Sequence, residues 1–217
     1  MATILHLVAS PRSESYSSRL AGAFFEAYRE ARPNDRIETL DVFQADIPQF
    51  YAPQAKAKYA VIAGQAPRDE AEAAWQPVVE AINHFKGFDM YVISSSMWNF
   101  GVPYRLKQYI DVIVQPSLTF AASAQGVTGL VTGRPLMLLL ARGGVYRSGN
   151  PQETFDFQET YLRCIFGFIG FTDIRAVAIQ GTLQDKTEQL ETDMRKAMAT
   201  ARGAAQELAR ETARPKQ

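Results

Sequence analysis

The chain has 217 residues, an apolar share of 47%, and 23 basic side chains balanced by 23 acidic ones. This length suits one folded domain, expected over residues 1–212 with a frayed tail at 213–217. The neutral charge balance and the single cysteine, Cys164, exclude a strong general attraction to nucleic acid or membranes, an internal disulfide and a multi-cysteine metal site. We therefore expect a cytoplasmic protein without a metal.

Five short segments are predicted to be strands. Several are nearly continuous apolar runs, which is typical of strands buried on both faces of a sheet. The segments are residues 3–9, 36–41, 89–94, 135–141 and 174–180. Apolar side chains at helical spacing lie between them, as at Leu20, Phe24 and Tyr28 in the first helix.

The alternation of strands and helices predicts a parallel sheet with helices on both faces, because crossovers between parallel strands are right-handed. Five such strands favour an α/β, flavodoxin-like, three-layer α/β/α fold with the strand order 2-1-3-4-5. The Rossmann arrangement is the alternative topology.

Two long connections interrupt this pattern. Residues 44–67 form a connection of a length that is typical of lids or contact surfaces, and residues 116–134 are expected to form an excursion like a β-hairpin. In the helix expected over 68–86, Pro77 should cause a kink or a division, because proline removes a hydrogen-bond donor from the helix interior.

Three loops should meet at one edge of the sheet, because parallel strands end on the same side. The first, SPRSESYSSRL at 10–20, places serine hydroxyls at the start of a helix, where N–H groups and the helix dipole favour an anion. The alternative is that Ser15 or Ser17 only caps the helix. Neither GxGxxG nor a P-loop is present, which argues against a dinucleotide held by its pyrophosphate and against an NTPase site.

The second loop contains the run MWNF, Met97 to Phe100, between a buried strand and an amphipathic helix. Large apolar side chains are costly to leave in water, so this run is expected either to lie along a planar heterocycle or to pack on the protein itself. The third loop, ARGGVYRSGNPQETF at 141–155, contains Gly143 and Gly144, which let backbone approach a ligand closely. A plain Gly-Gly turn is the alternative for this loop.

Over nearly its whole length the chain resembles the FMN-dependent NADH:azoreductases, also described as NADH:quinone oxidoreductases. The stretches that carry the resemblance are SYSSRLAGAF, MWNFGVPYRLKQYIDVI, GLVTGRP, ARGGVY and YLRCIFGFIGFTDI. The pair MWNFGVP and LKQYID is a specific signature, whereas many flavodoxin-like proteins share a serine-rich first loop. The resemblance implies a homodimer with one non-covalent FMN per subunit at the interface, NADH or NADPH as donor, and quinones or azo compounds as acceptors.

The resemblance also implies three groups of cofactor contacts. They are Ser10, Ser15, Tyr16 and Ser17 at the phosphate, Met97, Trp98, Asn99 and Phe100 along the ribityl chain and ring, and Arg142, Gly143 and Gly144 beside the pyrimidine end. Ala141 stands where a serine often precedes Arg-Gly-Gly. Ala121 and Ala122 stand where relatives can carry larger side chains, which puts the substrate range in question.

Phe120, Ala122 and Phe166 are expected to reach the substrate pocket, with core packing as the alternative for the two aromatic residues. The expected mechanism is a ping-pong transfer of two electrons that reduces quinones and cleaves azo compounds to aromatic amines. No side chain is expected to be a catalytic acid or base. His6 lies within a strand, His84 lies near a helix end, and Cys164 is expected to be a small core residue.

Two alternatives belong to other classes of protein. An electron-transfer flavodoxin would bind FMN and pass single electrons to protein partners. Such carriers are usually smaller and strongly acidic, whereas this chain is longer and neutral. A flavodoxin-like interaction module without flavin is the other alternative, which tight co-purification of FMN would exclude.

Overall fold

The structure, a computed structural model, describes residues 1–146, 149–183 and 188–212, so the tail expected to fray lies outside the described residues. Its strands are β1 (Thr3–Ala9), β2 (Arg36–Asp41), β3 (Met90–Ser96), β4 (Phe120–Ser123), β5 (Gly126–Gly129), β6 (Leu136–Ala141) and β7 (Ile174–Ile179). Its helices are α1 (Tyr16–Ala31), α2 (Ala52–Ile62), α3 (Asp69–Lys86), α4 (Tyr104–Ile113), the 3-10 helix η1 (Glu153–Phe155), α5 (Phe157–Phe168) and α6 (Glu188–Thr212).

The main sheet is parallel and has the order β2-β1-β3-β6-β7. Because β4 and β5 form a separate antiparallel pair, this is the predicted order 2-1-3-4-5 with the hairpin strands left out. The flavodoxin-like topology is therefore confirmed. The first two strands begin and end where the sequence predicts.

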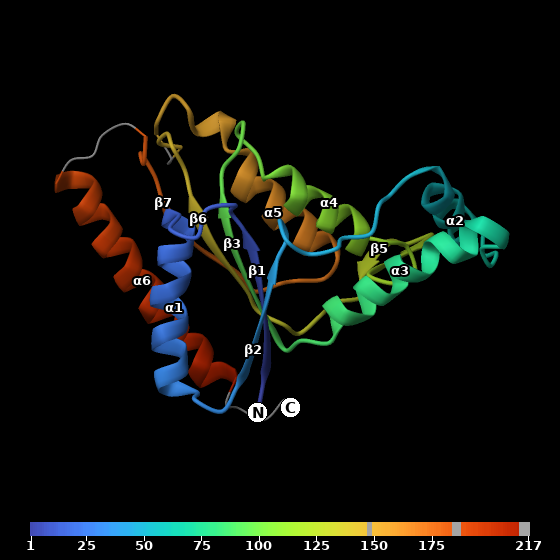
Figure 1. The fold of residues 1–217 in the computed structure, drawn as a ribbon, viewed down its shortest axis with the longest axis horizontal. Helices are drawn as coiled ribbons and strands as arrows, with labels where there is room; N and C mark the ends of the chain where they lie inside the picture. The colour runs from blue at the N-terminus through green and yellow to red at the C-terminus, as the bar shows by residue number, and fades with distance from the viewer. Residues whose placement is uncertain (147–148, 184–187, 213–217) are drawn as a thin grey trace.

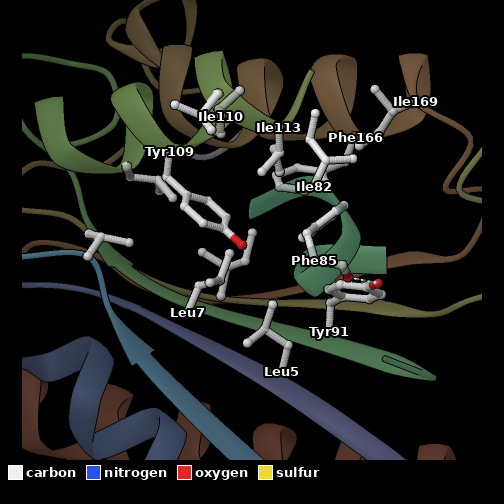
Figure 2. Close-up of a cluster of buried hydrophobic side chains, with 14 of the residues drawn as sticks. Leu5, Leu7, Ile82, Phe85, Tyr91, Tyr109, Ile110, Ile113, Phe166 and Ile169 are labelled. Carbon is white, nitrogen blue, oxygen red and sulfur yellow. Dashed lines mark hydrogen bonds between the residues drawn. The ribbon is translucent and has the colours of Figure 1, made fainter. Parts of the chain in front are cut away.

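Helices cover both faces of this sheet (Figure 1). On one face, α1 and α6 form a buried cluster with the sheet that includes Phe24, Tyr28 and Met194. On the other face, α3, α4 and α5 cover a second cluster, part of which is drawn in Figure 2 and which includes Phe85 and Tyr91. Burial of each such side chain contributes roughly 1.5–3 kcal/mol, so both clusters hold the strand ends in place.

The two long connections differ in how well the sequence predicts them. Residues 116–134 contain the expected hairpin, in which Phe120 of β4 pairs with Gly129 of β5. Residues 44–67 contain α2, a helix that the sequence does not reveal because only Ala57 of it is buried and no apolar stripe marks it. This helix packs against α3 and lies well away from the sheet (Figure 1).

Two glycines seat the hairpin against the connection between α5 and β7. A β-carbon on Gly129 would lie 2.2 Å from the backbone nitrogen of Gly170, which itself has a φ of +118°. The N–H of Val131 donates to the carbonyl of Ile169 over 2.8 Å. Backbone packs directly on backbone at this joint, and a side chain at Gly129 would force the two segments apart.

The division of a helix at Pro77, one of its two expected effects, does not occur, and the expected core position of Cys164 is wrong. Pro77 does not divide α3, which runs through it; Pro77 and Ala73, whose carbonyl loses its partner, are both exposed, so water can replace the missing bond. Cys164 is exposed rather than part of the core, because α5 turns Leu162 and Phe166 inward and leaves Arg163 and Cys164 outside.

Candidate active site

The sheet register lines up the carboxyl ends of β1, β3 and β6. Ala9 pairs with Ser95, and Ser96 pairs with Ala141, so the loops after these strands begin side by side. They surround a pocket of about 320 Å³, which confirms that the three loops meet at one edge. The described lining includes Ser10, Arg12, Ser15 and Tyr16 from the first loop, Ser96, Met97 and Trp98 from the second, and Ala141 and Gly143 from the third.

A fourth loop, after β7, also lines this pocket through Thr182 and Leu183. The N–H and the hydroxyl of Thr182 both donate to the carbonyl of Arg142 over 3.1 Å, and the N–H of Leu183 donates to the carbonyl of Gly143 over 3.2 Å. Nothing in the residue types of this loop marks it. The sequence could still have indicated this loop through topology, since β7 is parallel to the other strands of the sheet and must end at the same edge.

The first loop starts α1 with a serine cap. Ser15 is the N-cap residue, and its Oγ accepts a hydrogen bond from the N–H of Ser18 over 3.1 Å. The same oxygen lies 3.0 Å from the Oγ of Ser17, and both side chains are buried. Ser15 therefore caps α1, and the positive end of a 16-residue helix dipole faces the pocket.

The second loop makes a tight turn at its tip. Trp98 and Gly101 exchange two backbone hydrogen bonds of 3.0 and 2.9 Å, which leaves Asn99 and Phe100 as the turn residues. Their φ values are +45° and +68°, the left-handed geometry of a type I′ turn, which favours Asn followed by Gly. Asparagine tolerates this geometry, whereas phenylalanine stores strain on the order of 1–3 kcal/mol.

The four residues from Met97 to Phe100 lie in two different places. Met97 and Trp98 line the pocket, while Asn99 and Phe100 stand at the exposed tip. The ring of Phe100 lies 5.3 Å from that of Phe155, centroid to centroid. Trp98 is backed in turn by Phe43, whose ring centroid lies 5.7 Å away on the connection after β2. Phe43 is a supporting residue that no motif in the sequence marks.

Arg142 is directed away from the pocket. Its guanidinium is 3% exposed, with Nη1 2.9 Å from Asp156 Oδ2 and Nη2 2.9 Å from Glu159 Oε2. Its Nε donates to Gln158 Oε1 over 3.2 Å. The side chain thus fixes the start of α5, and any contact of this residue with a ligand would involve its backbone.

The two glycines of the third loop lie where other side chains approach them closely. A β-carbon on Gly143 would lie 2.6 Å from Leu183 Cδ1, and one on Gly144 would lie 2.9 Å from the hydroxyl of Tyr146. Gly143 lines the pocket directly, while Gly144 does not. Gly143 therefore contributes only backbone atoms to the lining, and its lack of a β-carbon leaves room for Leu183.

The expected substrate residues lie outside this pocket in the described part of the chain. Phe120 is half-buried on β4 and packs its ring 4.8 Å from that of Phe168, and Ala122 is exposed on the same strand. Phe166 is 1% exposed and belongs to the core cluster in Figure 2. Core packing therefore describes the position of Phe166.

The histidines also lie away from the pocket. His6 is buried with its Nε2 2.9 Å from Ser94 Oγ, and burial together with Arg29 lowers its pKa to about 4. His84 is exposed and lies 2.6 Å from Glu38 Oε1. Residues 1–146, 149–183 and 188–212 contain no cluster of metal-ligating side chains. Over the same ranges, no helix is long and apolar enough to cross a membrane.

Three comparisons relate this chain to known proteins. Residues 2–202 match the model of a family described by its flavodoxin-like fold. An FMN-dependent NADH:quinone oxidoreductase from Nitratidesulfovibrio vulgaris (strain DP4) is 48% identical over 209 residues, which cover 96% of this chain and 100% of the relative. A solved azoreductase from Bacillus anthracis str. Sterne has a TM-score of 0.87 at 28% identity, over 95% of this chain and 100% of that one. An FMN-dependent NADH-azoreductase from Bacillus anthracis str. Ames Ancestor, solved in complex with FMN, has a TM-score of 0.84 at 27% identity, over 95% and 99%.

Proposed function

Because the chain belongs to the flavodoxin-like FMN-dependent NADH:quinone oxidoreductases, we propose that it moves two electrons from NADH, in ping-pong order, to quinones and azo compounds. It is an oxidoreductase with FMN as its cofactor and NADH as its donor. The observation that carries the proposal is a single pocket that joins the start of α1, the apolar wall at Met97 and Trp98, and the bare backbone of Gly143.

The first part of the fit concerns the phosphate of FMN. We assign it to the start of α1, where Ser10, Ser15 and Tyr16 line the pocket and Ser17 supports Ser15 from behind. Hydroxyl groups and the helix dipole suit an anion there, and Arg12 adds a positive charge at the rim. This site belongs to the single FMN-binding domain that we assign to residues 1–212.

The second part of the fit concerns the flavin ring. A planar ring suits a wall of Met97 and Trp98, with Asn99 and Phe100 at its exposed edge. Gly143 suits the pyrimidine end, because it contributes only backbone atoms to the lining, beside Leu183, whose side chain a β-carbon there would meet. Arg142 contributes to this end through its backbone, since Asp156 and Glu159 hold its side chain.

FMN, when bound, supplies the acceptance and release of a hydride equivalent, which protein side chains do not perform. The chain itself binds, orients and shields the reactants. In this proposal the N–H group of Gly143, which lines the pocket, would stabilise negative charge at the pyrimidine end of bound FMN, by the logic of an oxyanion hole, and Gly144 would support it from outside the pocket. The described lining holds no histidine, carboxylate or cysteine, so water supplies the protons that the acceptor takes up.

The proposal includes a homodimer with the pocket at its interface. Phe100, Tyr104, Phe155 and Phe157 are 47%, 65%, 47% and 56% exposed. Exposed apolar surface of this extent marks an interaction surface, and a second copy there would cover the open side of the pocket. Phe120 and Ala122 would then reach the partner's substrate. Light scattering of the FMN-loaded protein should give a dimer, and a fully active monomer would refute this part.

Anaerobic stopped-flow absorbance tests the reaction. FMN-loaded protein is mixed with NADH or NADPH and then with 1,4-benzoquinone or methyl red. We expect NADH to bleach the flavin absorbance, either acceptor to restore it fully, and initial rates to give parallel lines. Intersecting lines would refute the ping-pong order, and failure of methyl red to restore the absorbance would remove azo compounds from the proposal.

A matched pair of glycine variants tests the site. Gly143→Ala places a β-carbon in the pocket against the mobile end of Leu183, so FMN affinity should fall about tenfold, the effect of roughly 1.4 kcal/mol. Gly203→Ala on α6, where no atom lies within 4 Å of the added carbon, is the control and should leave affinity unchanged. Equal affinities in a fluorescence titration would place FMN elsewhere.

A further inference from the structure

The loops that follow β6 and β7 lie side by side at the edge of the pocket, and backbone hydrogen bonds join them. Three consecutive N–H groups of the loop after β7 donate to three consecutive carbonyls of the loop after β6. These bonds run from Gly181 to Gly144 over 2.9 Å, from Thr182 to Arg142 over 3.1 Å and from Leu183 to Gly143 over 3.2 Å. The three carbonyls therefore all face the loop after β7.

The peptide unit between Arg142 and Gly143 has a fixed direction as a result. In a trans peptide the carbonyl and the N–H point to opposite sides of the chain. The described residues contain no cis peptide bond, and the carbonyl of Arg142 is turned toward Thr182. The N–H of Gly143 belongs to the same peptide unit, so it is turned away from Thr182.

The N–H of Gly143 is a donor that the fold does not use. Among residues 1–146, 149–183 and 188–212 no group accepts a hydrogen bond from it, whereas the N–H of Arg142 donates to the carbonyl of Ile179 over 2.9 Å. Gly143 is half-buried and lines the pocket, whose described lining contains no carboxylate. Backbone N–H groups seldom stay without an acceptor. This donor is thus available to a ligand that enters the pocket.

Thr182 supplies a second hydrogen bond to the same carbonyl. Its hydroxyl donates to the oxygen of Arg142 over 3.1 Å, in addition to its N–H. Glycine permits many backbone conformations, so the peptide before Gly143 needs an outside anchor to keep one orientation. Rotation of this peptide would break both bonds at once. Donation to the carbonyl also polarises the peptide unit, which makes its N–H a stronger donor.

The hydroxyl is the part of this anchor that depends on the residue type. Almost any residue at position 182 would offer the N–H, whereas the second bond needs a short side chain that carries a donor. Valine has nearly the shape of threonine but lacks the hydroxyl. The second bond can therefore be removed with little change of shape and no change of charge.

We propose that Thr182 is a positioning residue for the reduction of FMN. Its hydroxyl holds the peptide between Arg142 and Gly143 so that the N–H of Gly143 meets the pyrimidine end of the flavin, where reduced FMN carries more negative charge than oxidised FMN. Thr182 thereby raises the preference of the pocket for the reduced cofactor. This inference rests on the proposed function, because it requires FMN in this pocket.

Anaerobic redox titration of the FMN-loaded protein against an indicator dye measures this preference as the midpoint potential of the flavin. Thr182→Val should lower the preference for reduced over oxidised FMN about threefold, since one neutral hydrogen bond is lost. A tenfold change corresponds to about 30 mV for a two-electron couple, so the potential should become more negative by about 14 mV. Thr182→Ser keeps a hydroxyl and should keep the potential of the parent.

The control is a hydroxyl of the same kind outside the pocket. Thr200 on α6 donates from its hydroxyl to the carbonyl of Lys196 over 3.0 Å and does not belong to the described lining. Thr200→Val should leave the potential unchanged.

A fluorescence titration of the parent with oxidised FMN separates the two levels of the argument. A parent that does not bind FMN would refute the proposed function and this inference with it. If the parent binds FMN and Thr182→Val keeps the parent's potential, only this inference is overturned. Equal losses of affinity for oxidised and reduced FMN would also leave the potential unchanged, and would show that Thr182 only stabilises the loop.

Discussion

The loop after β1 and the turn after β3 meet at one pocket, yet they are built in opposite ways. At the start of α1, Ser15 caps the helix in the role that serine prefers. At the tip of the second loop, Phe100 adopts a φ of +68° that phenylalanine avoids. The conformational preferences of its own residues are enough to form the first loop, whereas contacts with neighbouring segments must hold the second.

The contacts that hold the second loop lead to α5. The N–H of Phe157 donates to the carbonyl of Phe100 over 3.1 Å. The preceding residue, Asp156, caps α5 and pairs with Arg142. A buried ion pair thus anchors the segment that keeps the turn in place. The comparison shows that a strained backbone turn beside a pocket needs contacts elsewhere in the fold to hold it. Those contacts can be tested by mutation separately from the turn itself.

The largest effect should come from removal of that anchor. Arg142→Met removes the charged partner of Asp156 and one of the two arginines that pair with Glu159, in a largely buried setting, so the free energy of unfolding should fall by about 3–5 kcal/mol. Urea denaturation measures this change. Arg163→Met breaks an exposed pair with Glu159 and should cost less than about 1 kcal/mol. Equal losses in the two variants would show that the anchor is no stronger than a surface pair.

The second-largest effect is a loss of stability at low pH, which comes from the strands beneath both loops. His6 on β1 faces Ser94 on β3, the ring of Phe25 and the charge of Arg29, and its pKa lies at about 4 instead of 6.5. The unfolded chain binds the proton more readily, so the stability from neutral His6 is complete above pH 6.5 and is lost as the pH falls toward 4. The loss should reach roughly 3 kcal/mol at pH 4.

Urea denaturation between pH 7.5 and 4 checks this pH dependence against His6→Gln, which cannot titrate. His84→Gln removes the other histidine and its contact with Glu38 Oε1, so its profile shows how much of the pH dependence does not come from His6. A parent and a His6→Gln variant with the same pH profile would show that His6 contributes nothing to the acid sensitivity.

A smaller loss of stability should come from changes in the loop after β1, which carries no backbone strain. Ser15→Ala removes the cap of α1 and should lower the free energy of unfolding by about 1 kcal/mol. FMN affinity should fall as well, because Ser15 lines the pocket. Ser18→Ala keeps the cap oxygen and is the control for both measurements. If Ser18→Ala proved as harmful as Ser15→Ala, the hydroxyl cluster rather than the cap would be the stabilising unit.

The smallest effect is expected at the strained turn after β3, where one substitution should give a more stable protein than its matched control. Phe100→Gly and Phe100→Ala both remove the ring, but only glycine accepts the left-handed geometry, so the glycine variant should be more stable by about 0.5–1 kcal/mol. Both should lose turnover with 1,4-benzoquinone to a similar degree. A glycine variant no more stable than the alanine variant would mean that the turn carries no strain.

The sequence predicts the parts of the molecule that repeat a simple pattern. β1 and β2 have the predicted bounds, the first as a buried apolar run and the second as a partly exposed strand, and the strand order follows from the alternation of elements. The meeting of three loops follows from strand direction alone. These predictions need only the period of the side chains and the handedness of the crossovers.

The remainder depends on contacts between distant residues. The direction of Arg142 is set by carboxylates on α5, which no local pattern announces. The strained turn lacks the Asn-Gly signature, because Phe100 occupies the second position. Cys164 is exposed because the phase of α5 is set by the partners that it meets. Each of these features depends on packing, which sequence periodicity does not describe.

The glycine joint beneath the β4–β5 hairpin also has a practical consequence for protein engineering. Gly129 and Gly170 fix the base of the hairpin, while Ser123 to Val127 are exposed at its tip. A combinatorial library confined to the tip would vary the outer surface of a fixed platform, so most members should fold. The same diversity at the two glycines would yield mostly misfolded chains. The hairpin is therefore a natural place to graft a new binding surface, provided that its base is left untouched.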